Sequence, residues 1–218
     1  MVTCIIGIYF PGKSAVGPQG YQVHCNLEPF ILNLACIDHH ACITTGIGNI
    51  HWHNLVGCPA GPRDQTKAED RKDVLVFTGD ELQTDLEVTG PVKVILYAAS
   101  SASDTDWTAK LVDVHPDGRP INLCDGIIRA RYRESPQNPT LIQPRKIYRY
   151  EIDLWVTSNV FLEGHKIRVE ISSSNFPRFD RNPNTGAPFG KSAEIIKARQ
   201  SIYHDIKRPS HILLPVIP

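Results

Sequence analysis

From residue 73 onward, hydrophobic and polar positions alternate in short runs that end at proline, glycine or aspartate. A period of two predicts a strand with one buried face, and turn residues such as Pro116, Asp117 and Gly118 separate the runs. No stretch of 12 or more residues carries helical periodicity. The pattern therefore predicts an all-β fold of eight to ten strands, an antiparallel β-sandwich or jelly roll. The predicted strands cover residues 73–78, 91–99, 107–114, 126–134, 146–156, 165–173, 201–204 and 211–216.

A row of arginines marks the predicted strand 126–134. Arg129, Arg131 and Arg133 alternate with apolar residues, so they should share the outer face of that strand. Such a row could bind anions, but it is more often a solvated or domain-contacting face. Its expected acidic partners are Glu134, Glu151 and Asp153.

Three further features complete this interpretation of the strands. A long loop rich in Asn, Pro and Arg, residues 175–190, is expected to be functional or mobile. Asp104 and Asp106 are interpreted as turn residues, because a calcium loop would need more carboxylates. Four aromatic side chains are the expected packing anchors of the core: Trp107, Tyr148, Tyr150 and Trp155.

The first 60 residues differ from the rest of the 218-residue chain. The chain has 23 basic and 23 acidic side chains, yet only Lys13, Glu28 and Asp38 lie in this segment, which also holds five of the six cysteines. The segment shows no clear period. We therefore expect two unlike parts: a poorly patterned leader or extension over 1–60, disordered or frame-shifted, and a β-domain over 61–218.

The overall charge excludes several function classes. Zero net charge and a pI near 7.1 argue against a nucleic-acid partner and against an anionic membrane surface. The N-terminus lacks the basic residues of a secretory signal, and no apolar run approaches the roughly 20 residues of a spanning helix. The expected location is therefore cytoplasmic, without nucleic-acid or membrane partners.

One stretch of the leader matches a nucleotide-binding motif. Residues 7–14 (GIYFPGKS) satisfy the phosphate-loop pattern G-x-x-x-x-G-K-S. That chemistry needs a helix directly after the loop, and the following AVGPQGY contains Pro18 and two glycines, which do not open a stable helix. Nucleotide binding by the leader is therefore a minor alternative.

The leader is also rich in side chains that can bind metal. Zinc sites use paired ligands at regular spacing, and only Cys36-x2-His39 and His51-x-His53 approach that rule here. A zinc site is therefore a second minor alternative, and no metal ligand or cofactor is assigned. The suitable side chains are His24, Cys25, Cys36, His39, His40, Cys42, His51, His53 and Cys58.

Serine-hydrolase chemistry has no motif in this chain. The nucleophile elbow G-x-S-x-G is absent, and Ser172, Ser173 and Ser174 have no glycines at the required offsets. No catalytic residue is therefore assigned. Four histidines near the predicted strands or turns are interpreted as surface or structural residues: His115, His165, His204 and His211.

Several long segments after residue 60 follow the order and spacing of a known domain. The chain resembles the C-terminal domain of the X-Pro dipeptidyl-peptidase / cocaine-esterase (CocE/NonD) family of serine hydrolases. This resemblance implies a jelly roll of the galactose-binding type. The segments that carry it are GPRDQ (61–65), EDRKDVLVFTG (69–79), LEVTGPVKVILYAAS (86–100), DTDWTAKLVDVHPDGRPINLCDGIIRARYR (104–133), VFLEGHKIRVEISSSNFPRFDRNPNTG (160–186) and residues 198–218.

In that family the domain follows an α/β-hydrolase domain that carries the Ser–His–Asp triad. The resemblance implies a non-catalytic domain, inactive alone, that supports a hydrolase of esters, amides or X-Pro peptides and takes part in oligomer contacts. Residues 1–53 match nothing in the family, so we expect a fragment of a larger gene with an unrelated leader. The alternative function is a stand-alone ligand- or carbohydrate-binding module.

Overall fold

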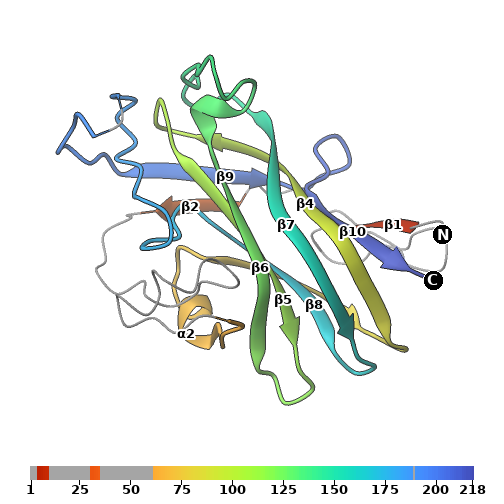
Figure 1. Ribbon diagram of the computed structural model, residues 1–218. Coiled ribbons are helices and arrows are strands. Elements are labelled where there is room, and N and C mark those ends of the chain that lie inside the picture. The colour runs from red at the N-terminus through yellow and green to blue at the C-terminus, as the bar shows by residue number, and fades with distance from the viewer. Residues whose placement is uncertain (1–3, 10–29, 35–60, 189) are drawn as a thin grey trace.

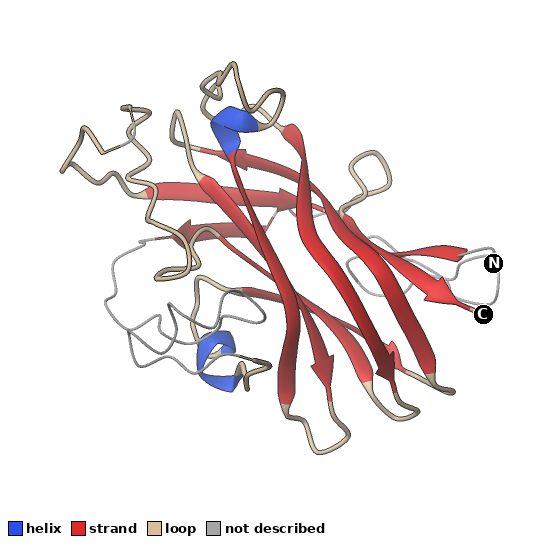
Figure 2. Ribbon diagram, in the orientation of Figure 1, coloured by secondary structure: helices blue, strands red, loops and turns tan. Residues whose placement is uncertain are grey.

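The computed structural model describes residues 4–9, 30–34, 61–188 and 190–218 (Figure 1). Within them the chain forms two antiparallel sheets that pack face to face as a β-sandwich (Figure 2). The all-β prediction is confirmed. In the described ranges, helix is limited to one short α-helix, α2 (Thr66–Glu69), and a single 3₁₀ turn at Ala130–Tyr132. Among the described residues, no helix has the length and apolar character needed to cross a membrane.

The larger sheet has six strands, and the longest of them, β4, lies at its centre. β4 pairs with β7 along one edge, and with β10 and then β9 along the other. β1 and β2 extend the sheet beyond β10 and β9. The strands are β1 (Cys4–Tyr9), β2 (Phe30–Leu34), β4 (Leu86–Ser100), β7 (Tyr148–Phe161), β9 (Ala198–Tyr203) and β10 (His211–Ile217).

The smaller sheet has four strands in the order β3-β8-β5-β6. Its central strand β5 is buried along its whole length, because the sandwich core covers one face. The other face carries polar side chains and includes Lys110, which lies opposite Glu170 of β8 and Asp125 of β6. The strands are β3 (Leu75–Glu81), β5 (Asp106–Val114), β6 (Pro120–Arg129) and β8 (Lys166–Ser172).

Two strands lie in the first 60 residues, where the hydrophobic pattern showed no period. β1 pairs with β10 and β2 pairs with β9, both antiparallel. Gly7 of the phosphate-loop match lies within β1, opposite Leu213, so its backbone is extended. Ile8 and Tyr9 of the motif also lie in β1, whereas its residues 10–14 and the nine candidate metal ligands of the leader lie outside the described residues.

The core contains two of the four predicted aromatic anchors at full burial. Trp107 is 1% exposed and Tyr150 0%, and their ring centroids lie 5.8 Å apart. Tyr148 packs against the core and is half-buried. The prediction for Trp155 is wrong: its side chain is 69% exposed and its φ is 68°. It lies where the β4–β7 register shifts, so the alternation of inward and outward side chains breaks there.

The strand predicted over 126–134 begins earlier, at Pro120, and ends earlier, at Arg129, than its sequence pattern indicates. β6 ends at Arg129 because the next backbone groups find other partners. The N–H of Ala130 donates to the carbonyl oxygen of Thr105, and the N–H of Arg131 donates to the Asp104 carboxylate. The chain therefore turns into the 3₁₀ segment, and the arginines that follow leave the outer face of the strand.

Candidate functional site

The predicted arginine row forms buried ion pairs instead of a solvated face. Arg129 Nε and Nη2 donate to the two carboxylate oxygens of Asp106 at 2.8 and 3.0 Å. Arg131 Nε donates to Asp104 at 2.8 Å. Asp104 and Asp106 are fully buried, and Asp106 is the first residue of β5, so its interpretation as a turn residue is wrong. Each carboxylate accepts an arginine because an unpaired charge at this depth would be costly.

The long loop over 175–190 lies on this cluster of charges. Asn182 Nδ2 donates to Asp104 at 3.0 Å and to Asp106 at 2.8 Å, and Arg131 Nη2 donates to the carbonyl oxygen of Ala187 at 3.0 Å. Burial raises the pKa of Asp106, while the hydrogen bonds from Arg129 and Asn182 act in the opposite direction. The hydrogen bonds of Asn182 and of the Ala187 carbonyl therefore hold the loop against Asp104, Asp106 and Arg131.

A second carboxylate fixes the start of the same loop. Asp125 of β6 accepts a hydrogen bond from Asn175 Nδ2 at 2.6 Å and pairs with Arg178. Asp125 is 1% exposed. The loop is therefore tied to the smaller sheet at its start, by Asn175, and near its middle, by Asn182.

Arg133 points back over the protein and not outward. Its guanidinium lies 4.4 Å from the ring centroid of Tyr148 and donates to the carbonyl oxygens of Ala130 and Thr140. Of the predicted acidic partners, Glu134 does pair with Arg133, at 3.3 Å. The other two have different partners: Glu151 pairs with Lys93, and Asp153 accepts the backbone N–H of Trp155.

The outer face of the smaller sheet holds a buried charged pair beneath α2. Lys110 Nζ lies 3.4 Å from Glu170 Oε2 and donates to Gln65 Oε1 at 3.0 Å. Gln65 immediately precedes α2, so this helix covers the pair. Arg168 of β8 donates to Glu69, the last residue of α2, at 2.6 Å. Burial lowers the pKa of Lys110 and raises that of Glu170.

Apolar side chains are exposed along β7. Trp155 and Val156 are 69% and 66% exposed, and Val160 and Leu162, the residue directly after β7, are each about half exposed. We call these four residues the β7 patch. Val156 lies opposite Pro91 of β4, which is also exposed. β7 lies between β6 and β4 in Figure 1, and it pairs with β4 in the larger sheet.

The serines next to β8 have structural partners. Ser172 Oγ lies 2.5 Å from Thr108 Oγ1 and donates to the carbonyl oxygen of Ser174. Ser173 Oγ is hydrogen-bonded to Gln200 Nε2 at 3.2 Å in the buried interior. Neither hydroxyl is hydrogen-bonded to a histidine of the part of the chain that the structure describes, so neither has there the neighbouring base that an activated nucleophile requires.

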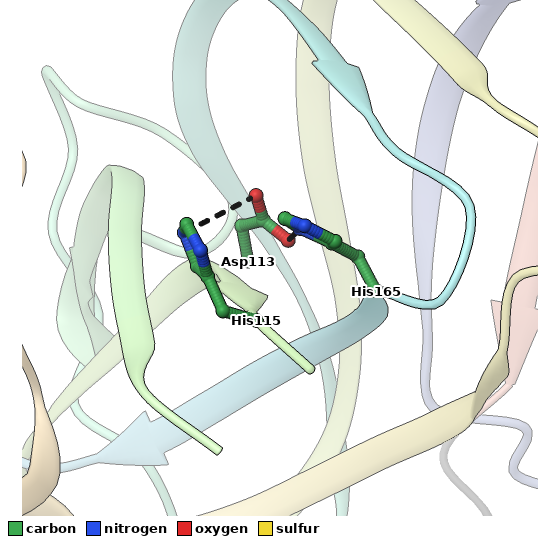
Figure 3. Close-up of side chains that lie close together, drawn as sticks. All are labelled: Asp113, His115 and His165. Atoms are coloured by element: carbon green, nitrogen blue, oxygen red, sulfur yellow. Dashed lines mark hydrogen bonds and ion pairs between the residues drawn. The ribbon is translucent and has the colours of Figure 1, made fainter. Parts of the chain in front are cut away.

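Two of the four histidines interpreted as single structural residues lie together. His115 and His165 flank the carboxylate of Asp113, with the ring centroids of the histidines 4.6 Å apart (Figure 3). The sequence did not indicate this group, because His165 is 52 residues from Asp113. His204 instead contacts the ring of Phe77 edge-on, and His211 lies 2.6 Å from the carbonyl oxygen of Pro209.

Comparison with known proteins identifies relatives over most of the chain. Cocaine esterase from Rhodococcus sp. (strain MB1 Bresler) is 54% identical over 172 residues, which are 78% of this chain and 29% of that protein. An aminopeptidase structure from the marine sediment archaeon Thaumarchaeota archaeon is 36% identical, with a TM-score of 0.68. The match covers 71% of this chain and 27% of the aminopeptidase chain. A structure of an alpha-amino acid ester hydrolase, also 36% identical, has a TM-score of 0.67 over the same shares.

The chain thus spans less than a third of the length of these hydrolases. A family model for the X-Pro dipeptidyl-peptidase C-terminal non-catalytic domain matches residues 35–213, and this match begins within the segment that the sequence assigned to the leader. The match confirms the resemblance seen in the sequence. The chain belongs to the family of C-terminal non-catalytic domains found in CocE/NonD and X-Pro dipeptidyl-peptidase hydrolases.

Proposed function

We propose that this chain supports an α/β-hydrolase catalytic domain of a serine hydrolase that acts on esters, amides or X-Pro peptides. The observation that carries the proposal is the difference in coverage in the match to cocaine esterase. The matched region includes 78% of this chain but only 29% of that protein. A relative of that length has room for a catalytic domain outside the matched region. The β-sandwich then contributes a docking surface and no reacting group.

The docking surface is the β7 patch. Large apolar side chains that gather on one strand are typical of an interaction site, because burying them removes apolar area from water. The rival surface expected from the sequence, the arginine row, does not face a partner since Arg129 and Arg131 pair with buried acids. The β7 patch includes Trp155, and tryptophan is enriched among the residues that dominate binding energy at interfaces.

A domain exchange tests docking with full-length proteins. The region of Rhodococcus cocaine esterase that matches this chain is replaced by this chain, and the chimera is assayed with an aryl ester and by thermal unfolding. We expect an active chimera. Trp155→Ser with Val156→Ser should lower both its activity and its Tm, because the docked interface loses apolar contact.

The matched control is Ile206→Ser, which removes an apolar side chain that is 85% exposed in the loop between β9 and β10. This variant should leave the chimera unchanged. A Trp155/Val156 variant that behaves like the Ile206 variant would show that the β7 patch is not the docking surface. A folded chimera without esterase activity would contradict the supporting role itself.

The chain by itself should not turn over substrate. Incubation of the purified protein with aryl esters and X-Pro-anilides should give only the uncatalysed rate, because Ser172 and Ser173 lack a histidine partner. Turnover that is lost on substituting Ser14, Ser172, Ser173 or Ser174 would overturn the non-catalytic role. The alternative of a ligand-binding module is not favoured, since Asn175, Arg178 and Asn182 of its expected binding loop bond to the sandwich.

A further inference from the structure

Three side chains meet where two turns of the sandwich lie side by side. Asp113 is near the end of β5, His115 follows that strand, and His165 directly precedes β8 (Figure 3). His165 Nδ1 lies 2.8 Å from Asp113 Oδ1, and His115 Nε2 lies 4.0 Å from Asp113 Oδ2. We call these residues the Asp–His–His cluster.

The two turns that carry the cluster are in close proximity. Gly164, next to His165, has φ 81°, and a Cβ there would lie 3.6 Å from Cγ of Pro116, next to His115. A ligand bound by the cluster would therefore bridge the β5–β6 turn and the β7–β8 turn. The positions of the ligands are set by the ends of two strands, which makes the cluster more rigid than one on a free loop.

The cluster has the composition and spacing of a transition-metal site. One ligand atom from each residue can be chosen so that all three lie within 4.8 Å of one another. Zinc binds histidine nitrogen and carboxylate oxygen at about 2.0–2.2 Å, which places tetrahedral ligands about 3.3 Å apart. The separations of 2.8 Å between His165 Nδ1 and Asp113 Oδ1 and of 4.0 Å between His115 Nε2 and Asp113 Oδ2 lie on either side of that spacing. Two histidines and one carboxylate also leave a coordination position for water.

Charge favours a cation at this position. Asp113 is 7% exposed, and among the described residues its ion-pair partners are His115 and His165. A histidine is a cation only when protonated, so the buried carboxylate has no permanent positive partner. The nearby Arg119 does not serve, because its Nε pairs with Asp117 at 2.6 Å. A divalent ion would supply this missing charge.

We propose that the Asp–His–His cluster binds Zn²⁺ through Asp113, His115 and His165. The ion would replace the proton shared between His165 Nδ1 and Asp113 Oδ1 and link the two turns. His115 is the most exposed of the three ligands, with 32% of its side chain accessible, so it marks the side from which the ion and its water enter. Mg²⁺ and Ca²⁺ prefer sites made of oxygen ligands, and the two imidazoles select against them.

The test uses the full chain, stripped of metal with a chelator and titrated with zinc chloride in a calorimeter. We expect wild-type protein to bind one Zn²⁺ more than each of the variants His115→Gln, His165→Gln and Asp113→Asn. The comparison must be made within the full chain, because the leader holds cysteines and histidines that can bind zinc on their own. The matched control is Asp117→Asn, a carboxylate of the same turn outside the cluster, which should bind as wild-type does.

Thermal unfolding gives a second measurement. Zinc at about 100 times its Kd should raise Tm by about 5–10 °C in a domain of this size, whereas MgCl₂ and CaCl₂ should leave Tm unchanged. The rise should be smaller in the cluster variants. Cobalt substitution identifies the ligands, since thiolate ligation gives a charge-transfer absorption that histidine and carboxylate ligation lack.

Equal zinc stoichiometry in wild-type protein and in the His115 variant would overturn the proposal, as would the absence of any zinc binding by the wild-type chain. A cobalt complex whose spectrum is unchanged by the His115 and His165 substitutions would also overturn it. Asp113→Asn removes a buried charge and could impair folding. In that case His115→Gln, in the partly exposed turn, decides the result.

Discussion

Gly126 of β6 lies against the backbone of Asp153 in β7. A Cβ atom at Gly126 would stand 2.0 Å from the carbonyl oxygen of Asp153, well inside any contact that real side chains make. β6 belongs to the smaller sheet and β7 to the larger one. The absence of a side chain at Gly126 therefore allows the two sheets to approach closely along this edge of the sandwich.

Gly126→Ala should destabilise the domain by about 1–3 kcal/mol or more, because the added methyl group must push two strands apart. Chemical denaturation measures the loss. The control is Gly79→Ala in β3, where the nearest atom to a new Cβ is 3.4 Å away. An equal loss of unfolding free energy in the two alanine variants would contradict the close approach of β6 and β7.

Trp155 provides a prediction about backbone strain. Its φ of 68° is unfavourable for any residue with a Cβ, and a left-handed conformation costs roughly 1–2 kcal/mol. Trp155→Gly should therefore be more stable than Trp155→Ala by about 1 kcal/mol, although glycine usually weakens strands. Comparing the two variants cancels the loss of the indole. A glycine variant less stable than the alanine variant would contradict the bulge.

Asp104 provides a prediction about the loop. Asp104→Ala removes the acceptor for Arg131 and Asn182 and leaves a buried arginine without its carboxylate. Breaking a buried pair in this way costs about 3–5 kcal/mol. Amide exchange should become faster over the loop that Asn182 anchors. The matched variant Asp117→Ala breaks an exposed pair with Arg119 and should change neither quantity.

An Asp104→Ala protein with wild-type stability and unchanged exchange in the loop would show that the cluster of charges does not hold the loop. Equal loop exchange in the Asp104 and Asp117 variants would lead to the same conclusion.

Glu170 provides a prediction about pH. Burial raises its pKa from 4.5 to about 7, so the folded protein keeps this proton at a pH where the unfolded chain has released it. The folded state then binds more protons than the unfolded state between these values, and this contribution to stability falls as pH rises. Glu170→Gln removes the titrating group. The free energy of unfolding should therefore decrease from about pH 4.5 to about pH 7 in wild-type protein relative to the variant.

Urea titrations of both proteins across that range provide the measurement. Parallel pH profiles for wild-type and Glu170→Gln would contradict a raised pKa. A wild-type profile that rises relative to the variant would indicate that the Lys110 ion pair outweighs burial, since it favours the charged carboxylate.

The sequence predicted the strands from β3 to β10 because their apolar residues alternate and turn residues separate them. It failed where a long-range partner overrides the local pattern. The alternation continues from Ile128 through Arg133, yet Asp104 captures the N–H of Arg131 and the strand ends. Nothing in the alternation itself distinguishes an arginine that faces solvent from one that meets a buried carboxylate.

The same limit applies to the sites. The Asp–His–His cluster forms only when the β5–β6 turn and the β7–β8 turn come together, and sequence spacing does not encode that contact. A usable signal exists in hindsight: Asp113 and His115 flank a single residue at a predicted turn, and His165 follows the glycine of another. Trp155 gave no signal at all, since the bulge that exposes it depends on pairing with β4.

The central position of β4 has a consequence for how the protein unfolds. One strand of 15 residues is the neighbour of β7, β9 and β10, and these three strands do not pair with one another in the larger sheet. Release of β4 would separate β7, the pair β9–β2 and the pair β10–β1 from one another. The sheet should therefore lose its structure in one cooperative transition, and the slowest-exchanging amides of the molecule should be those of β4.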